Sequence, residues 1–204
     1  LDGNAVTTLT SQAMFVGPYA LALPSGGGLV VQTDFDKTGV KTLSSGTIWS
    51  INLTSGLATP VMEGMGRPRG LGRLGDGKIG VADRLRQTLH VLDLSGTPSL
   101  AALAGLLDQT GHIDADGTAA RFYSPHGIVE LPGGDLLVAA TENHCLRRIE
   151  RDGTVTTYAG RDDTSATVDG TLAEARFKSP RALAIDGSGT VFVTDTSAHR
   201  VRRI

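Results

Sequence analysis

The chain has 204 residues, of which 40% are hydrophobic, and its formal net charge at pH 7 is -2. This length is sufficient for a sizeable buried core, whereas the acidic balance and an aromatic content of 4% disfavour a nucleic-acid surface. The single cysteine, Cys145, excludes an internal disulfide and a multi-cysteine metal site, and no apolar run reaches the roughly 18 residues of a membrane span.

A repeated pattern organises the sequence from end to end. Each repeat opens with a proline, and these prolines are Pro18, Pro68, Pro125 and Pro180. They divide a single domain into units at about residues 16–64, 65–122, 123–177 and 178–204. Repetition at this period predicts one supersecondary unit that is used four times.

Within each unit, short runs follow one another in the same order. The first comes directly after the proline (YALAL, RGLGRL, HGIVEL, RALAI), and the second follows a glycine-rich turn (GLVVQTD, KIGVAD, DLLVAAT, TVFVTDT). A third run (TIWSINL, TLHVLDL, HCLRRIE, HRVRRI) comes next, and the first three units add a fourth (LATPVM, SLAALAG, TVTTYAG). Short runs rich in β-branched residues and separated by glycines predict antiparallel strands with tight turns. Four strands per unit predict an all-β propeller with four four-stranded antiparallel blades.

The two ends of the chain bear on how such a propeller closes. The last unit stops after its third run, and residues 1–15, which begin LDGNAVTTLTS, resemble the fourth run of unit three, RDGTVTTYAG. One interpretation is that this segment is a closing strand that completes the last blade and removes an exposed sheet edge. The other interpretation is that the four units are part of a larger propeller.

Units three and four resemble the NHL repeat. In unit three the resemblance rests on SPHGIVELPGGDLLVAATENHCLRRI, followed by TVTTYAG, with Asn143-His144-Cys145-Leu146 at the turn that gives the repeat its name. Unit four carries the matching string SPRALAIDGSGTVFVTDTSAHRVRRI. The resemblance implies a β-propeller, usually of about six blades. The ARF strings at 120–122 and 175–177 resemble a subtype common in bacterial and secreted proteins. This subtype implies an extracytoplasmic location, although the sequence itself leaves the compartment open.

The position directly after each proline is the main candidate for function. It holds Tyr19, Arg69, His126 and Arg181, so the residue type varies from unit to unit while the surrounding framework repeats. If the blades are arranged radially, these side chains converge near the axis, and convergent polar groups in a concavity are typical of a binding site. Two more candidates lie farther along the inner strands and are expected to reach the channel, namely Arg73 and Glu130.

The charged residues that recur from unit to unit are expected to support the framework. Asp34, Asp83 and Asp195 end the second strand of their units, where carboxylates usually accept hydrogen bonds from turn amides.

Paired arginines occupy equivalent places in the third strands of units three and four, at 147–148 and 202–203. Strand alternation directs the members of each pair to opposite sides of the sheet, and one member is expected to reach a carboxylate of a neighbouring blade. The arginines of the ARF strings, Arg121 and Arg176, are expected to pair with nearby acids.

The same ring of residues allows an enzymatic alternative. Related propellers include a zinc-dependent amidating lyase whose histidines lie in Pro-His segments, and Ser124-Pro125-His126-Gly127 resembles such a segment. A catalytic zinc needs three protein ligands, but the matching positions carry Tyr19, Arg69 and Arg181. Lactonase-like propellers bind a divalent metal through Glu, Asn and Asp, and Glu130 is the one counterpart in this sequence.

The sequence therefore predicts a non-catalytic interaction module. It is expected to bind a protein segment or a small ligand on the propeller face around the channel, with no cofactor, no metal and no membrane insertion. The first alternative is a metal-dependent lyase or hydrolase that acts in the channel. The second is single-stranded RNA binding through an arginine-rich face, because some NHL propellers bind RNA in this way; the net charge argues against this partner.

Overall fold

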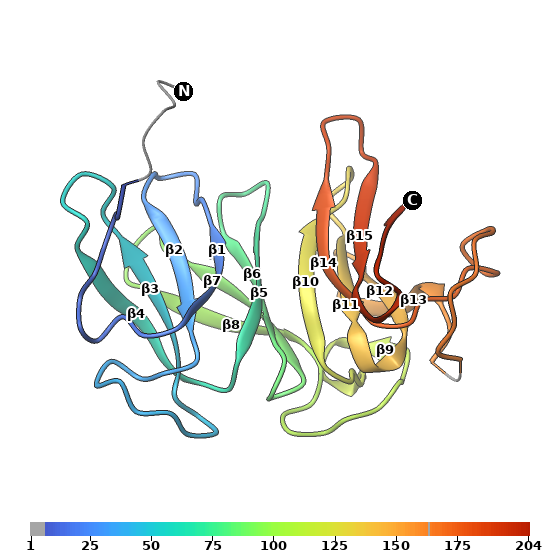
Figure 1. The fold of residues 1–204 in the computed structure, drawn as a ribbon. Helices are drawn as coiled ribbons and strands as arrows, with labels where there is room; N and C mark the ends of the chain where they lie inside the picture. The colour runs from blue at the N-terminus through green and yellow to red at the C-terminus, as the bar shows by residue number, and fades with distance from the viewer. Residues whose placement is uncertain (1–6, 163) are drawn as a thin grey trace.

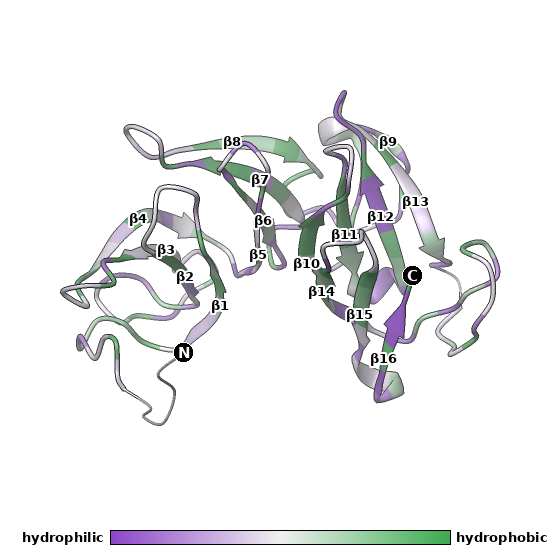
Figure 2. Ribbon diagram, turned by 90° about the horizontal axis from the view of Figure 1, so that it is seen from above, coloured by the Kyte–Doolittle hydropathy of each residue, from purple (hydrophilic) through white to green (hydrophobic). Residues whose placement is uncertain are grey.

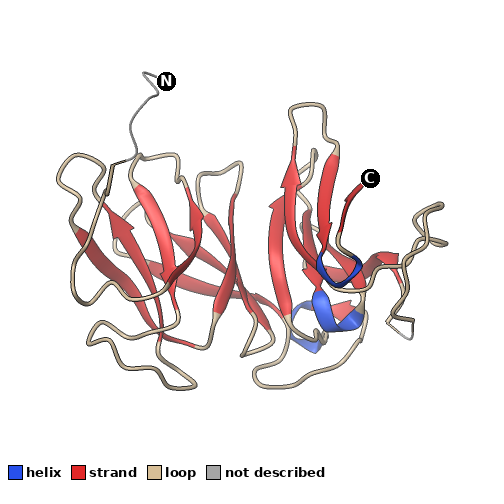
Figure 3. Cartoon of the chain, viewed as in Figure 1, coloured by secondary structure: helices blue, strands red, loops and turns tan. Residues whose placement is uncertain are grey.

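The regular secondary structure of the protein is almost entirely β-strand (Figures 1 and 3). The computed structural model describes residues 7–162 and 164–204. Blade one is a four-stranded antiparallel sheet of β1 (Pro18–Ala22), β2 (Leu29–Thr33), β3 (Gly46–Ile51) and β4 (Ala58–Met65). Blade two repeats this order with β5 (Pro68–Arg73), β6 (Ile79–Asp83), β7 (Thr88–Asp93) and β8 (Ser99–Ala104).

Blades three and four differ at their outer edges. Blade three contains β10 (Pro125–Glu130), β11 (Leu136–Ala140), β12 (Cys145–Ile149), β13 (Thr154–Gly160) and the short outer strand β9 (Ala115–Asp116). Blade four contains β14 (Pro180–Ile185), β15 (Val191–Asp195) and β16 (Arg200–Arg203). Short 3-10 turns complete the elements, at η1 (Gly117–Ala119), η2 (Thr141–Asn143) and η3 (Thr196–Ala198). The sequence did not indicate β9.

The four blades fan out around a common axis, with the first strand of each blade nearest the middle (Figure 2). Inner strand β5 packs beside β1 and β10, and β10 packs beside β14. The prediction of an all-β propeller with four blades is therefore confirmed. The predicted closing strand at residues 1–15 falls partly outside the described residues, and residues 7–15 form no strand.

The core lies between the blades, as β11 of blade three illustrates. Every residue of this strand is buried. Strand alternation sends Leu136 and Val138 toward a cluster shared with blade two, and Leu137 and Ala139 toward a cluster shared with blade four. Each blade is thus held by the apolar faces of its neighbours.

A buried arginine fastens the long connection before blade three. The guanidinium of Arg147 donates to the carbonyl oxygens of Arg121 and Ile113, at 2.9 Å each, and contacts a carboxylate oxygen of Asp114 at 2.5 Å. It also lies 5.0 Å from the centroid of the Phe122 ring. We call this arrangement the arginine clamp.

Blade four repeats the clamp with equivalent residues. Arg202 donates to the carbonyl oxygens of Arg176 and Val168, at 2.9 and 2.8 Å, and pairs with Asp169 at 2.5 Å beside the Phe177 ring. Its guanidinium also lies 3.5 Å from the Asp195 carboxylate of its own blade. The prediction that one arginine of each pair reaches a carboxylate is confirmed, although that carboxylate lies in the connection and not in a neighbouring blade.

The predicted partners of Arg121 and Arg176 are wrong. Their guanidiniums donate to the main-chain carbonyls of residues 118–120 and 173–175. The acids of the two connections are instead engaged by the clamp arginines, which approach from the third strand.

Candidate functional site

Each inner strand begins at one of the repeated prolines with a β-bulge. The pairing with the second strand shifts register directly after Pro18, Pro68, Pro125 and Pro180. A bulge bends its strand and re-aims a side chain. The residue that follows the proline is the one in the bulge.

The four side chains in the bulges line one pocket of about 260 Å³, which we call the axial pocket. They are the predicted ring residues, one from each blade: Tyr19, Arg69, His126 and Arg181. Apolar side chains continue the wall of the pocket, namely Leu21, Leu71, Ile128 and Leu183. The structure therefore brings together all four positions that the sequence placed near the axis.

Two glycines allow the inner strands to approach closely. A Cβ atom added at Gly70 would lie 1.8 Å from the carbonyl oxygen of His126, and one added at Gly127 would lie 2.4 Å from that of Arg181. Neither contact is sterically possible. Glycine two residues after the proline is thus a sequence signal for the close packing of blades two, three and four, and the sequence analysis missed it.

The other two predicted site residues lie in a second pocket farther along the same strands. This pocket, of about 460 Å³, is lined by Arg73, Glu130 and apolar residues. Glu130 accepts a hydrogen bond from the amide of Gly75, and Arg73 lies 3.4 Å from the Ser25 hydroxyl. Both residues reach the space between the inner strands, but they do not join the ring of the axial pocket.

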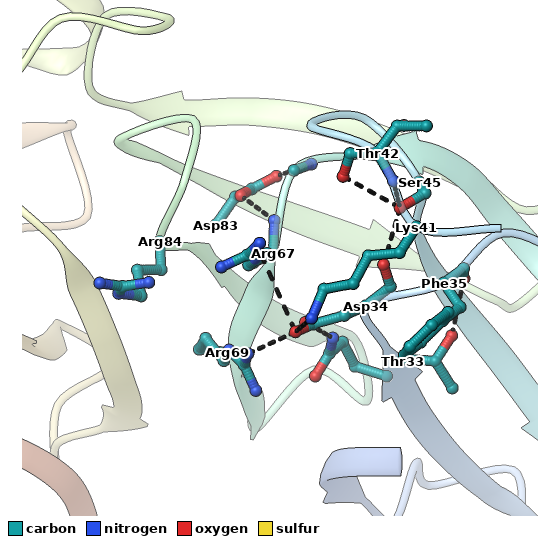
Figure 4. Close-up of polar contacts among 12 residues, drawn as sticks. Thr33, Asp34, Phe35, Lys41, Thr42, Ser45, Arg67, Arg69, Asp83 and Arg84 are labelled. Carbon is teal, nitrogen blue, oxygen red and sulfur yellow. Dashed lines mark hydrogen bonds and ion pairs between the residues drawn. The ribbon is translucent and has the colours of Figure 1, made fainter. Parts of the chain in front are cut away.

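Arg69 is held by two neighbours in blade one. Its guanidinium lies 2.5 Å from a carboxylate oxygen of Asp34 and stacks 3.8 Å from the centroid of the Tyr19 ring. Lys41 and Arg67 approach the same carboxylate at 3.8 and 3.9 Å (Figure 4). Burial lowers the pKa of Arg69 from its ordinary value, and the Asp34 carboxylate opposes this shift. One buried carboxylate is therefore shared by three cations at the edge of the pocket.

The other second-strand aspartates confirm the predicted framework role. Asp83 accepts hydrogen bonds from the amides of residues 66–67, at 2.8 Å each. Asp195 accepts them from the amides of residues 178–179, at 2.9 and 2.7 Å. Asp34 differs because its carboxylate pairs with Arg69 of blade two.

His126 is the buried member of the ring. Its Nδ1 lies 3.0 Å from the carbonyl oxygen of Ser124 and 2.9 Å from the hydroxyl of Thr141, which itself donates to the carbonyl oxygen of Pro180. Because a carbonyl only accepts, Nδ1 carries the proton, which leaves Nε2 as an acceptor in the neutral ring. Burial is the main cause that lowers the pKa of His126 to about 4, and three guanidiniums act in the same direction, those of Arg84, Arg181 and Arg69. The imidazole is therefore neutral at pH 7.

Arg84 is a site residue that the sequence analysis missed. It follows Asp83 at the end of β6, and its Nε lies 2.9 Å from the Ser124 hydroxyl, beside the backbone that carries His126. The equivalent positions of the other units hold Phe35, Thr141 and Thr196, so no arginine recurs there. Its approach to the axial pocket from the loop of blade two therefore becomes visible only in the folded chain.

Metal-binding groups are sparse in the part of the chain that the structure describes. Within residues 7–162 and 164–204, no three side chains of His, Cys, Asp or Glu are grouped so that they could hold a metal ion. The same residues contain no helix of the length and apolarity that a bilayer crossing requires.

Comparison with known proteins supports the repeat and the fold. The family model of the NHL repeat matches residues 122–149, which run from the clamp phenylalanine to the end of β12. No curated protein matches the chain. A structural genomics protein of unknown function from Bacteroides thetaiotaomicron is 22% identical, with a TM-score of 0.76, and the match covers 93% of this chain and 47% of that one.

Other similar structures carry different descriptions. An auxiliary nutrient binding protein from Bacteroides thetaiotaomicron is 18% identical, with a TM-score of 0.72 and coverage of 91% of this chain and 58% of that one. A calcium-binding protein, regucalcin, from Agrobacterium tumefaciens is 17% identical, with a TM-score of 0.60 and coverage of 87% and 52%. The chain thus spans about half the length of the structures that it matches, and at these identities the likeness concerns the fold. The protein carries an NHL repeat at residues 122–149, and its fold is a β-propeller.

Proposed function

We propose that this propeller is a non-catalytic binding module that takes a protein segment or a small ligand in the axial pocket. The observation that carries the proposal is the contrast between the ring and its surroundings. Four strands of one repeated design bring a tyrosine, a histidine and two arginines to one concavity, whereas the clamp and the turn aspartates recur with the same residue types. Convergent polar groups with an apolar wall are typical of ligand sites.

Arg181 is the ring residue whose replacement tests this function most cleanly. Its side chain is exposed, and within the described residues it makes no hydrogen bond or ion pair. Arg69, by contrast, holds Asp34 and stacks on Tyr19, so its removal would change both the fold and the pocket. Loss of binding in Arg181→Ala at unchanged thermal stability therefore reports on the pocket alone.

The experiment is an NMR screen of the labelled protein with a fragment library that contains acids, amines and neutral amides. Backbone amide shifts should change around Tyr19, His126 and Arg181, and these responses should disappear in a Tyr19→Ala/Arg181→Ala double variant. The matched control is Arg200→Ala, which removes an exposed arginine from the outer part of blade four. Fragments that bind only elsewhere, or that bind the double variant equally well, would contradict the proposal.

A further inference from the structure

The cations around the axial pocket outnumber the carboxylates. Lys41, Arg67 and Arg69 share the carboxylate of Asp34. Two further guanidiniums, those of Arg84 and Arg181, have no carboxylate partner within the described residues. Arg84 contacts only a neutral hydroxyl, at 2.9 Å. The pocket therefore has positive charge that the protein itself leaves unbalanced.

The remaining carboxylate near the pocket does not offset these guanidiniums. Asp83 is 1% exposed, and its two oxygens accept hydrogen bonds from the amides of residues 66, 67 and 86. Some other arginines of the blades pair with acids, as Arg86 does with Asp108 and Arg148 with Asp135. Because the whole chain has a net charge of -2, the positive excess is a local property of the axial pocket.

An apolar wall leads away from this charged end. Leu21, Leu71, Ile128 and Leu183 line both the axial pocket and the second pocket that contains Arg73 and Glu130. The Leu21 side chain is 63% exposed although it faces this space. A ligand that enters the axial pocket and continues along the inner strands would therefore meet cations first and apolar side chains next.

We infer that the axial pocket takes the carboxylate of an amphipathic ligand, with the acid group between Arg84 and Arg181 and an apolar body along Leu21 and Leu183. This inference rests on the proposed binding function and adds the ligand class to it. Guanidiniums hold carboxylates through charge-assisted and bidentate hydrogen bonds. The acceptor Nε2 of neutral His126 suits an N–H or O–H donor next to the acid group.

Two sources supply this chemistry. One is an acidic residue between apolar residues of a peptide, whose backbone N–H would face His126. The other is a free organic acid with an apolar chain. Pockets of about 260 and 460 Å³ that share a wall have room for either.

The test is calorimetric titration of the intact chain with matched probes. The peptide probes are the capped tripeptide Leu-Glu-Leu and its isosteric amide Leu-Gln-Leu, and the small probes are hexanoate and hexanamide. We expect each acid to bind at least about tenfold more tightly than its amide, and added salt to weaken only the acids. Tighter binding of the tripeptide than of hexanoate assigns the peptide source, and the reverse order assigns the free acid.

Variants connect the binding to the pocket. Arg181→Ala should weaken the acids about tenfold and leave the amides unchanged, whereas the control Arg200→Ala should change neither. Leu21→Asp, at an exposed position that folding tolerates, should weaken acids and amides alike.

The outcomes separate the inference from the function on which it rests. If acids and amides bind equally well and Leu21→Asp abolishes the binding of both, the inferred ligand class is wrong, but the proposed binding function of the pocket stands. Binding that neither Arg181→Ala nor Leu21→Asp affects would overturn both, and no binding by any probe would overturn the inference. A single-stranded oligouridine that binds more tightly than the acids and depends on Arg181 would replace it with nucleic-acid recognition.

Discussion

Blades three and four share the most similar sequences, yet they are buried to different extents. Leu137 and Leu146 of blade three are fully buried, whereas the residues at the equivalent positions of blade four, Phe192 and Val201, are 37% and 70% exposed. The opposite face of blade four, which carries Val193, is buried against blade three. The repeat therefore encodes the sheet, whereas the core at each position depends on whether a neighbouring blade covers that face.

Blades three and four should differ most in stability when a charge is placed on the face that is buried in blade three and exposed in blade four. Leu146→Asp buries a carboxylate between two blades and should cost more than about 4 kcal/mol, which removes cooperative unfolding. Val201→Asp leaves the carboxylate in water and should change the free energy of unfolding by less than about 0.5 kcal/mol. Urea denaturation followed by circular dichroism measures both. Similar destabilisation by the two variants would show that blade four is covered in solution.

Truncation of a side chain on this face should give a smaller difference in stability, again with the blade-three variant the less stable one. Leu137→Ala should destabilise by about 2–4 kcal/mol, because it leaves a cavity between blades three and four. Phe192→Ala removes a larger but partly exposed side chain and should cost less than about 1 kcal/mol. Thermal unfolding of the two variants ranks them. If Phe192→Ala proved the more damaging variant, the burial contrast would be wrong.

The arginine clamp is expected to show the smallest difference, because both blades contain it. Arg147→Ala and Arg202→Ala each remove hydrogen bonds to two carbonyls and one carboxylate. Each should cost about 3 kcal/mol, with less than about 1 kcal/mol between them. Chemical denaturation of both variants tests this equality. A clamp that contributes in one blade only would mean that its geometry does not repeat.

The sequence was sufficient to predict the blades and the residues of the axial pocket because both follow from local periodicity. Alternating runs after each proline correspond to strands, and the post-proline residues share one place in every blade. The convergence of Tyr19 and His126 on one pocket required no knowledge of side-chain packing, since the radial arrangement of the blades alone brings the four inner strands together.

Contacts that break the symmetry were not predictable from the repeat. Asp34 resembles Asp83 in sequence but pairs with Arg69, because the blade next to Asp34 has an arginine after its proline, whereas the blade after that of Asp83 has His126 there. Arg84 reaches Ser124, two residues before His126, from a loop position that holds no arginine in the other units. The partner of Arg121 was also missed, since the nearest acid along the chain, Asp116, accepts a hydrogen bond from the Thr154 hydroxyl, and Asp114 is taken by Arg147 from a different strand.

The convergence of His126 and Arg181 on one positively charged pocket is the central claim, and an NMR titration of the His126 ring tests it most directly. The free protein should show a His126 pKa of about 4, because burial and the neighbouring guanidiniums disfavour the imidazolium. In Arg181→Ala this pKa should rise, since a nearby cation is removed, and saturation with Leu-Glu-Leu should raise it in the original chain. A His126 pKa near 6.5 that responds to neither change would contradict the account.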